Sequence, residues 1–285
     1  MTRSRITNTS FHSNAVAFSA VGGFITEYIS GGTHYRVHSF TAAGTHKILF
    51  NHRGTIDFLI VGGGGGSAAA EGYQGATGGG GAGGMVEGTS QSISAGSFTV
   101  VVGDGGARSS DVNTPASSGG DSSFNGYTAK GGGGGSDYVG SDAERVGANG
   151  GCGAGGSESN QTAGASNQDT YSSVTGVTGF GNAGGNGANY QSGTTGSGGG
   201  GGAGGAGTAG NSGVAAGGVG RANNIRTGAN HTYCRGGNGY AATNSSSLYE
   251  IANSGNGAHG VSTTSGNSTN SGNGASGIVV IRYAI

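Results

Sequence analysis

Three segments of the chain gather side chains that could recognise a ligand. They are residues 136–146, 157–180 and 221–251, where the regular glycine spacing lapses and aromatic rings stand among Ser, Asn and Gly. Tyrosine supplies rigid amphipathic area, and the small polar residues supply adaptable hydrogen bonds. We predict that these segments contact a binding partner, with capping of the molecule's ends as the alternative. The candidate residues are Tyr138, Tyr171, Phe180, Tyr190, Tyr233 and Tyr249; the third segment adds Arg221, Arg226, His231 and Arg235.

Metal chemistry is weakly supported. His34 and His38 fall on one face of a predicted strand, with His46 and His52 nearby. Four histidines could bind a metal, but a solvated strand face explains them equally well. We therefore predict no metal site.

Two short patterns are similar to the calcium-binding nonapeptide repeat. They are GGNGANYQ at 184–191 and GGNGYAAT at 236–243. The position of the repeat's aspartate is held by Asn189 and Ala241, and the patterns do not form a tandem array. Calcium is not expected.

Catalytic and nucleotide-binding signals also fail. GxGxxG patterns arise inevitably in so glycine-rich a chain, and none of them follows a strand and opens a helix. The acidic residues show no acid/base pair at a defined spacing. We predict neither a cofactor nor an enzyme activity. The acidic residues considered are Asp57, Asp104, Asp121, Asp137, Asp142, Glu144 and Asp169.

Glycine recurs at every third position along whole stretches of the chain. A left-handed helix of the polyproline II type has three residues per turn, so every third residue lies on the same edge. Glycine on that edge lets a neighbouring backbone approach with no Cβ in the way. The period predicts packed glycine helices, about 50 Å long over residues 198–213. The glycines in phase are Gly72, Gly75, Gly78, Gly81 and Gly84, then Gly198, Gly201, Gly204, Gly207, Gly210 and Gly213.

The composition also fits a disordered linker, because 72 of the 285 residues are glycine. Ordering these glycines costs roughly 36–72 kcal/mol more than ordering alanines, at about 0.5–1 kcal/mol each. Dense packing of the backbone can offset this cost. Charged residues are only 9% of the chain, which favours order. A single proline, Pro115, excludes collagen.

Five strands can be predicted from alternating or continuous apolar runs: 34–40, 45–50, 55–61, 97–103 and 277–283. Glycines interrupt every amphipathic run before it reaches the length of an α-helix. The predicted fold class is therefore mostly irregular and β. A small N-terminal antiparallel β region precedes a bundle of polyglycine II helices, a C-terminal strand closes the fold, and almost no α-helix is present.

We divide the chain into a short anchoring segment, residues 1–32, and a glycine-rich domain, residues 33–285. Within the domain, 33–106 should be rich in strands, 107–276 should form the helical body and 277–285 the closing strand. The anchoring segment is polar, with too few apolar residues for a core of its own. Its candidate anchoring residues are Phe11, Val16, Phe18 and Phe24.

The net charge and the two cysteines limit which partners, compartment and metal sites we expect for this protein. A net charge of −1 gives no electrostatic case for nucleic acid or an anionic membrane. The chain has no apolar run long enough for a signal sequence or a membrane span, so we expect synthesis in a cytoplasm. Cys152 and Cys234 fit no metal spacing. We interpret them as small packing residues, and a disulfide between them stays open.

Six motifs occur in a fairly specific order. They are YRVHSFTAAGTHKILF at 35–50, DFLIVGGGGG at 57–66, GGGGAGG at 78–84, FTVVVGDGG at 98–106, GGDSSFNGYTAKGGGGG at 119–135 and GNGASGIVVIRYAI at 272–285. In this order, residues 33–285 resemble the glycine-rich domain of bacteriophage tail-fibre and virion proteins and of bacterial surface proteins.

The resemblance implies a fold and a function. Similar domains in the tip adhesins of T-even-like phages, and in the extracellular part of anaplastic lymphoma kinase receptors, fold as bundles of polyglycine II helices. In the adhesins, loops at the end of the bundle bind the host receptor. Those loops do not align by motif, so no receptor residue is carried over. Residues 1–32 fall outside the resemblance.

We therefore expect a non-enzymatic virion protein that is made in the host cytoplasm. Residues 1–32 would bind other virion proteins, the loops would bind a host receptor, and self-assembly stays open. One alternative is a structural or decorating virion protein without a receptor. Another is an ice-binding protein, although its threonine pairs, Thr194–Thr195 and Thr263–Thr264, are isolated.

Overall fold

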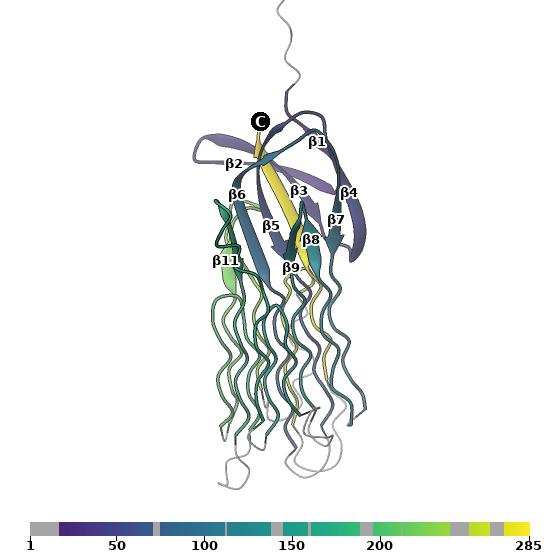
Figure 1. The fold of residues 1–285 in the computed structure, drawn as a ribbon, viewed down its shortest axis with the longest axis vertical. Helices are drawn as coiled ribbons and strands as arrows, with labels where there is room; N and C mark the ends of the chain where they lie inside the picture. Colours follow the sequence, from purple (N-terminus) through teal and green to yellow (C-terminus); the bar gives the residue numbers. More distant parts are fainter. Residues whose placement is uncertain are drawn as a thin grey trace, which may run out of the picture.

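Sheets and glycine helices lie end to end in this protein. The computed structural model describes residues 17–70, 75–111, 113–137, 145–158, 161–188, 196–211, 213–239, 251–262 and 271–285. Antiparallel sheets form one end, called here the head, and extended glycine-rich segments form a long bundle below it (Figure 1). These residues contain no α-helix. The predicted fold class is confirmed.

Two larger sheets and one ribbon make up the strands. The six-stranded sheet has the order β10 (Val177–Phe180), β6 (Met85–Ile93), β5 (Gly54–Val61), β13 (Ile278–Ala284), β3 (Thr33–Phe40) and β2 (Phe24–Ser30). The five-stranded sheet has the order β1 (Ala20–Val21), β4 (Gly44–Phe50), β7 (Gly96–Val102), β8 (Ser122–Phe124) and β9 (Tyr127–Ala129). The ribbon pairs β11 (Arg221–Asn223) with β12 (His231–Tyr233).

The central strands of the six-stranded sheet, β5 and β13, are buried on both faces. In β5, Phe58 and Ile60 belong to one buried cluster and Leu59 and Val61 to another, as strand alternation requires. The first cluster fills the space against the five-stranded sheet, where Phe58 meets Phe124 edge to face with ring centroids 5.9 Å apart. The second cluster packs against the ribbon and the start of the bundle. Because both faces are covered, the central strands read as continuous apolar runs.

The bundle continues the strands. Residues 62–70 leave the end of β5, residues 75–84 lead into β6, and residues 271–277 lead into β13. Each strand direction therefore sets the direction of the helix joined to it, and the helices run side by side away from the sheets (Figure 1).

Hydrogen bonds from residues 75–84 repeat every third residue. The amides of Thr77, Gly80 and Gly83 donate to the carbonyls of 261, 258 and 255 at 3.0, 2.8 and 2.8 Å. The amides of Gly79 and Ala82 donate to a second neighbour, residues 198–201. Bonds to one neighbour at a spacing of three are the signature of a three-residue helix. Among the described residues, this helix bonds to segments 62–65, 130–133, 152–155, 198–201, 237 and 255–261.

Close packing explains the glycines. A Cβ at Gly80 would overlap the carbonyl oxygen of Gly65, and one at Gly207 would overlap that of Gly199. Main-chain groups thus form the interior of the bundle, where larger side chains form the interior of the head. Carbonyl oxygens likewise lie close to a hypothetical Cβ at Gly78, Gly81, Gly198, Gly201, Gly204 and Gly210.

The remaining predicted glycines differ. Gly84 faces the side-chain oxygen of Gln168, and Gly75 is buried. Gly213 is open, since the nearest atom to its Cβ position is the Asn211 Oδ1 at 3.5 Å. The period alone placed Gly213 among the packing residues, but its edge of the helix has no neighbour close by. Gly72 lies outside the described residues.

All five predicted strands are confirmed, within a residue or two at each end. The predicted boundaries between segments fit less well. The head begins before residue 33, because β2 pairs with β3 along its whole length. Residue 106 is not a boundary either, since helices precede it and strands β8 to β12 follow it. The chain alternates between head and bundle throughout.

The cysteines are buried and unpaired. The Cys152 thiol donates to the carbonyl of Gly83 at 3.6 Å, and the Cys234 thiol donates to the carbonyl of Gly84 at 3.7 Å. Burial raises the pKa of Cys152 to about 12 and that of Cys234 well above its usual range. Both behave as small packing residues in this structure, as the sequence led us to expect.

Candidate ligand-binding groove

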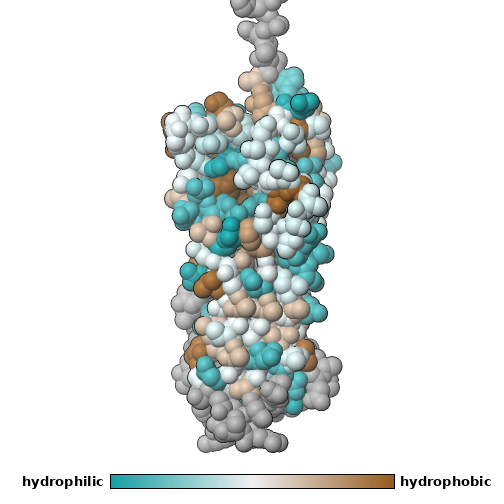
Figure 2. Space-filling view, turned by 60° about the vertical axis from the view of Figure 1, so that its left-hand side comes forward, coloured by the Kyte–Doolittle hydropathy of each residue, from teal (hydrophilic) through white to brown (hydrophobic). Residues whose placement is uncertain are grey.

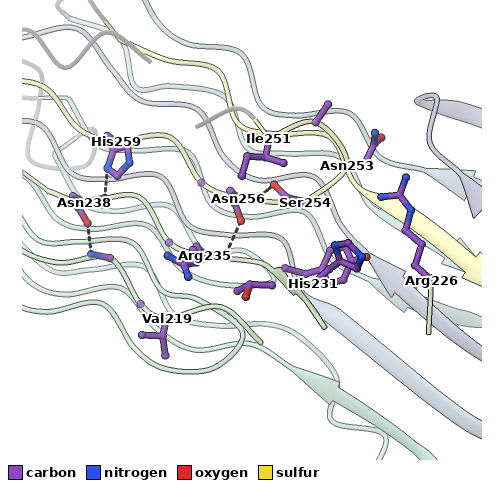
Figure 3. Close-up of a pocket in the computed structure, with 17 residues that line it drawn as sticks. Val219, Arg226, His231, Arg235, Asn238, Ile251, Asn253, Ser254, Asn256 and His259 are labelled. Atoms are coloured by element: carbon purple, nitrogen blue, oxygen red, sulfur yellow. Dashed lines mark hydrogen bonds between the residues drawn. The ribbon is translucent and has the colours of Figure 1, made fainter. Parts of the chain in front are cut away.

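A hollow of about 770 Å³ opens on the side of the molecule where the ribbon meets the bundle. Residues from three stretches, 217–219, 226–238 and 251–259, line it (Figure 3). We call this hollow the groove. Its volume lies within the range of about 300–1,000 Å³ that small-molecule sites occupy.

The ribbon that borders the groove is tied to the six-stranded sheet. Glu87 of β6 pairs with the Arg221 guanidinium at 3.4 Å and accepts a hydrogen bond from Asn223 Nδ2 at 3.0 Å. The Tyr28 hydroxyl of β2 donates to the carbonyl of Ile225 at 3.1 Å. These contacts fix the turn between β11 and β12, which carries Arg226, at the edge of the groove.

Two parallel glycine helices form the floor. The amide of Cys234 donates to the carbonyl of Ser254 at 2.8 Å, that of Gly257 to Arg235 at 2.9 Å, and that of Gly260 to residue 238 at 2.8 Å. Residues 234–239 and 254–260 therefore run in register, which brings side chains that are about twenty positions apart in sequence onto one surface.

The asparagines of the groove use their oxygens to hold the backbone. Asn256 Oδ1 accepts from the Arg235 amide and Asn238 Oδ1 from the Gly217 amide, both at 2.9 Å (Figure 3). The backbone N–H of Asn238 donates to His259 Nδ1 at 2.9 Å. Burial lowers the pKa of His259, so its ring is neutral near pH 7. Both asparagines line the groove and keep their Nδ2 groups as donors.

Arg226 and Arg235 flank His231 in the groove (Figure 3). Among the described lining residues, none is an aspartate or glutamate. The His231 Nε2 lies 2.8 Å from the Thr227 hydroxyl. The local charge of the described lining is therefore positive, although the whole chain carries a net charge of −1.

Tyr233 lines the groove and is 2% exposed, and its buried hydroxyl lies near the Arg226 guanidinium. Burial raises the pKa of this hydroxyl, and the charge and hydrogen bond of Arg226 oppose the rise. Tyr233 therefore links the core to Arg226 at the edge of the groove.

The other predicted recognition residues lie apart from the groove. Tyr171 packs edge to face on Tyr127, with ring centroids 5.3 Å apart, and its hydroxyl bonds to the backbone of Thr128 at 2.9 and 3.2 Å. Phe180 lies in β10 with the Arg221 guanidinium 3.7 Å from its ring centre. Both make the contacts of packing residues within the head. Tyr138, Tyr190 and Tyr249 lie outside the described residues.

Of the four predicted anchoring residues, one is packed in the head, one is exposed, and two lie outside the described residues. Phe18 stacks on Phe50 with ring centroids 5.7 Å apart and meets Tyr283 edge to face at 4.8 Å. Phe24 begins β2 and is 71% exposed. Phe11 and Val16 lie outside the described residues.

The histidines considered for a metal are engaged separately. His34 pairs with Glu27 at 3.1 Å, and His46 Nε2 lies 2.7 Å from the carbonyl of Ala42. His38 is buried, with its Nδ1 2.7 Å from the carbonyl of Gly22. Within the part of the chain that the structure describes, no three His, Cys, Asp or Glu side chains are grouped to hold a metal ion.

The sequence predicted Tyr233 and the neighbouring Arg226, His231 and Arg235 as one segment, and the groove contains all four. It did not predict residues 217–219 or 252–259. The shared Gly-Asn-Gly at 237–239 and 255–257 was the available signal, because it marks helices with the same side-chain pattern.

Comparison with protein families agrees with the architecture. A family model described as a glycine-rich domain matches residues 41–284. The chain belongs to this glycine-rich domain family. A search of curated proteins found no match. No helix among the described residues of the glycine-rich domain is long and apolar enough to cross a membrane.

Proposed function

We propose that this glycine-rich domain is a non-enzymatic component of a bacteriophage virion, in a tail fibre or a surface protrusion, that attaches the particle to a host surface. It would dock on other virion proteins at the head and expose loops along and beyond the bundle. The resemblance of its ordered motifs to phage fibre domains motivates the phage assignment.

The observation that carries the proposal is the polarity of the molecule. The first and last described residues, 17 and 285, both belong to the head, and the glycine helices run away from it (Figure 1). A neighbour joined at the head would leave the bundle projecting outward. Because the helices are cross-linked by backbone hydrogen bonds, such a projection loses little conformational entropy when it meets a receptor.

The head surface supports docking. Large apolar side chains are exposed on β1, β2 and β4, with Val21 of β1 directly opposite Leu49 of β4. Apolar patches are visible over the head among hydrophilic surface (Figure 2). β2 is also an edge strand, a place where another chain can add. The exposed residues are Val21 70%, Phe24 71%, Ile25 46%, Ile29 72% and Leu49 53%.

Particle incorporation tests the docking. Removing residues 1–32, as the sequence suggested, would delete β1 and β2 and disturb the head, so the sharper variant lacks residues 1–16 only. We expect the full chain in purified particles and the truncated chain in the unassembled fraction. Recovery of the truncated chain in particles would remove the docking role of residues 1–16 and leave docking to the exposed head surface, and absence of the full chain from particles would remove the proposed function.

A structural or decorating role without a receptor is the second candidate, and the cross-linked bundle favours it equally. Binding of the purified protein to susceptible host cells distinguishes the two. An attachment protein binds the cells with a saturable signal that copy number on the particle would amplify, and a decorating protein does not bind.

A further inference from the structure

We propose that the groove binds a negatively charged saccharide, a sugar chain that carries carboxylate or phosphate groups. The inference rests on the proposed attachment function and names the chemistry of its ligand. It follows from four properties of the described lining: an excess of hydrogen-bond donors, two arginines, a buried hydroxyl and a size that fits sugar rings.

Donors outnumber free acceptors among the side chains. Asn238 and Asn256 each use the amide oxygen to accept from a neighbouring backbone, so each presents its NH₂ group. Arginine has donors only. A ligand that complements this lining must be rich in acceptors, and oxyanions are the strongest acceptors for guanidinium groups.

Charge selects the same ligand class. Arg221 and Arg282, which lie outside the groove, are paired with Glu87 and Asp57 at 3.4 and 2.9 Å. Arg226 and Arg235 have no such carboxylate partner among the described residues. An anionic group in the groove would take the place that those carboxylates hold elsewhere.

Tyr233 adds a specific contact. Its ring is part of the core, and its hydroxyl is buried beside the Arg226 guanidinium. A ligand oxygen that pairs with Arg226 would lie next to this hydroxyl and accept its proton. A site that holds such a buried polar group rejects ligands that cannot pair with it.

The size of the groove indicates a sugar chain and not an isolated ion. A single phosphate would leave most of the 770 Å³ unfilled. His231 presents a ring, and the exposed side chains of Val219 and Ile251 supply apolar edges. Sugar rings have apolar faces that pack on such surfaces and hydroxyls that accept from amide groups.

Calorimetric titration of the full chain tests the inference. The probes are an oligogalacturonate, a phosphorylated oligomannose and a neutral oligomannose of equal length, so the first two arms distinguish carboxylate from phosphate. We expect one charged probe to bind, with an affinity that falls as salt rises from about 50 to about 300 mM. Equal binding of the neutral probe, or no binding of either charged probe, would overturn the inference.

Variants locate the site. Replacing both Arg226→Gln and Arg235→Gln should weaken binding of the charged probe at least about tenfold, because two charge-assisted contacts are lost. The matched control combines Lys47→Gln in β4 with Arg53→Gln between β4 and β5, which removes the same two positive charges from exposed residues outside the groove. Tyr233→Phe should weaken binding about threefold or more while the chain stays folded. Unchanged affinity in the double variant contradicts the assignment.

The same variants separate this inference from the proposed function. If the double variant still attaches to host cells as well as the native chain, the groove is not the attachment site, and the attachment function survives without it. If the native chain never attaches to cells yet binds the charged probe through Arg226 and Arg235, the attachment function fails and the groove's ligand class stands.

Discussion

At four places in the bundle, an asparagine between two glycines forms the same hydrogen bond to a neighbouring helix. The Oδ1 atoms of Asn186, Asn238, Asn256 and Asn273 each accept a backbone amide from a neighbouring helix, at 2.8–2.9 Å. The flanking glycines let the helices come close, and the asparagine then joins them. Asn186 and Asn238 belong to the two patterns that are similar to the calcium-binding repeat. In this structure their side chains join neighbouring helices by hydrogen bonds.

A matched pair of glycines tests the packing at the residue scale. Gly207→Val places a branched side chain against the carbonyl of Gly199 and should destabilise the fold by about 1–3 kcal/mol. Gly213→Val, in the same glycine series, meets open space and should change stability by less than about 0.5 kcal/mol. Chemical denaturation of both variants gives the comparison. An equal loss of unfolding free energy in both variants would mean that the destabilisation comes from replacing any glycine in the series, and not from close contact with a neighbouring backbone.

The sequence did not predict the strands that are made largely of polar residues. β6 reads MVEGTSQSI, a run without clear alternation, yet it pairs with β5 on one side and β10 on the other. Its Gly88 leaves room for the Phe58 ring, which a Cβ would overlap. Tertiary packing, and not strand propensity, makes this segment a strand.

His38 connects three elements and should make the head sensitive to pH. Its ring lies between the turn at Gly22 and Tyr283 of β13, whose hydroxyl is 3.2 Å from Nε2. Burial and the nearby Arg36 charge lower the pKa of His38 below 6.5, and the Gly22 carbonyl opposes this. The unfolded chain therefore binds more protons, so stability is fully present above pH 6.5 and is lost as the pH falls through the folded pKa.

Thermal unfolding at pH 7 and at pH 5 measures this effect. The native chain should melt at a lower temperature at pH 5, and His38→Gln should reduce the difference between the two. The pKa of His259 is also lowered by burial, so His259 should add to the pH dependence in the same direction, and His259→Gln serves as the comparison. A pH dependence that His38→Gln leaves intact would show that this histidine is not its source.

Head and bundle form one mechanical unit at the scale of the molecule. Glycine helices are joined directly to strands β5, β6 and β13, and the central helix, residues 75–84, bonds to segments that range from 62–65 to 255–261. A helix cannot leave the bundle without breaking bonds to several others. This connectivity predicts one cooperative unfolding transition.

Hydrogen exchange measured by mass spectrometry checks the cooperativity. Amides of β5 and of residues 78–84 should open with the same free energy, and Gly207→Val should lower both by the same amount. A bundle that opens while β5 stays protected would show two independent units and would contradict the proposed rigid projection.

The sequence by itself determined the local backbone. Glycine every third residue and apolar runs such as 55–61 predicted three-residue helices and strands, because both depend on residues close in the chain. Only the tertiary structure decided which helices are neighbours, and therefore that Gly207 is enclosed, Gly213 is open and residues 217–219, 226–238 and 251–259 share a groove. A period of three gives each helix several equivalent edges, and the choice among them is made by packing between distant segments.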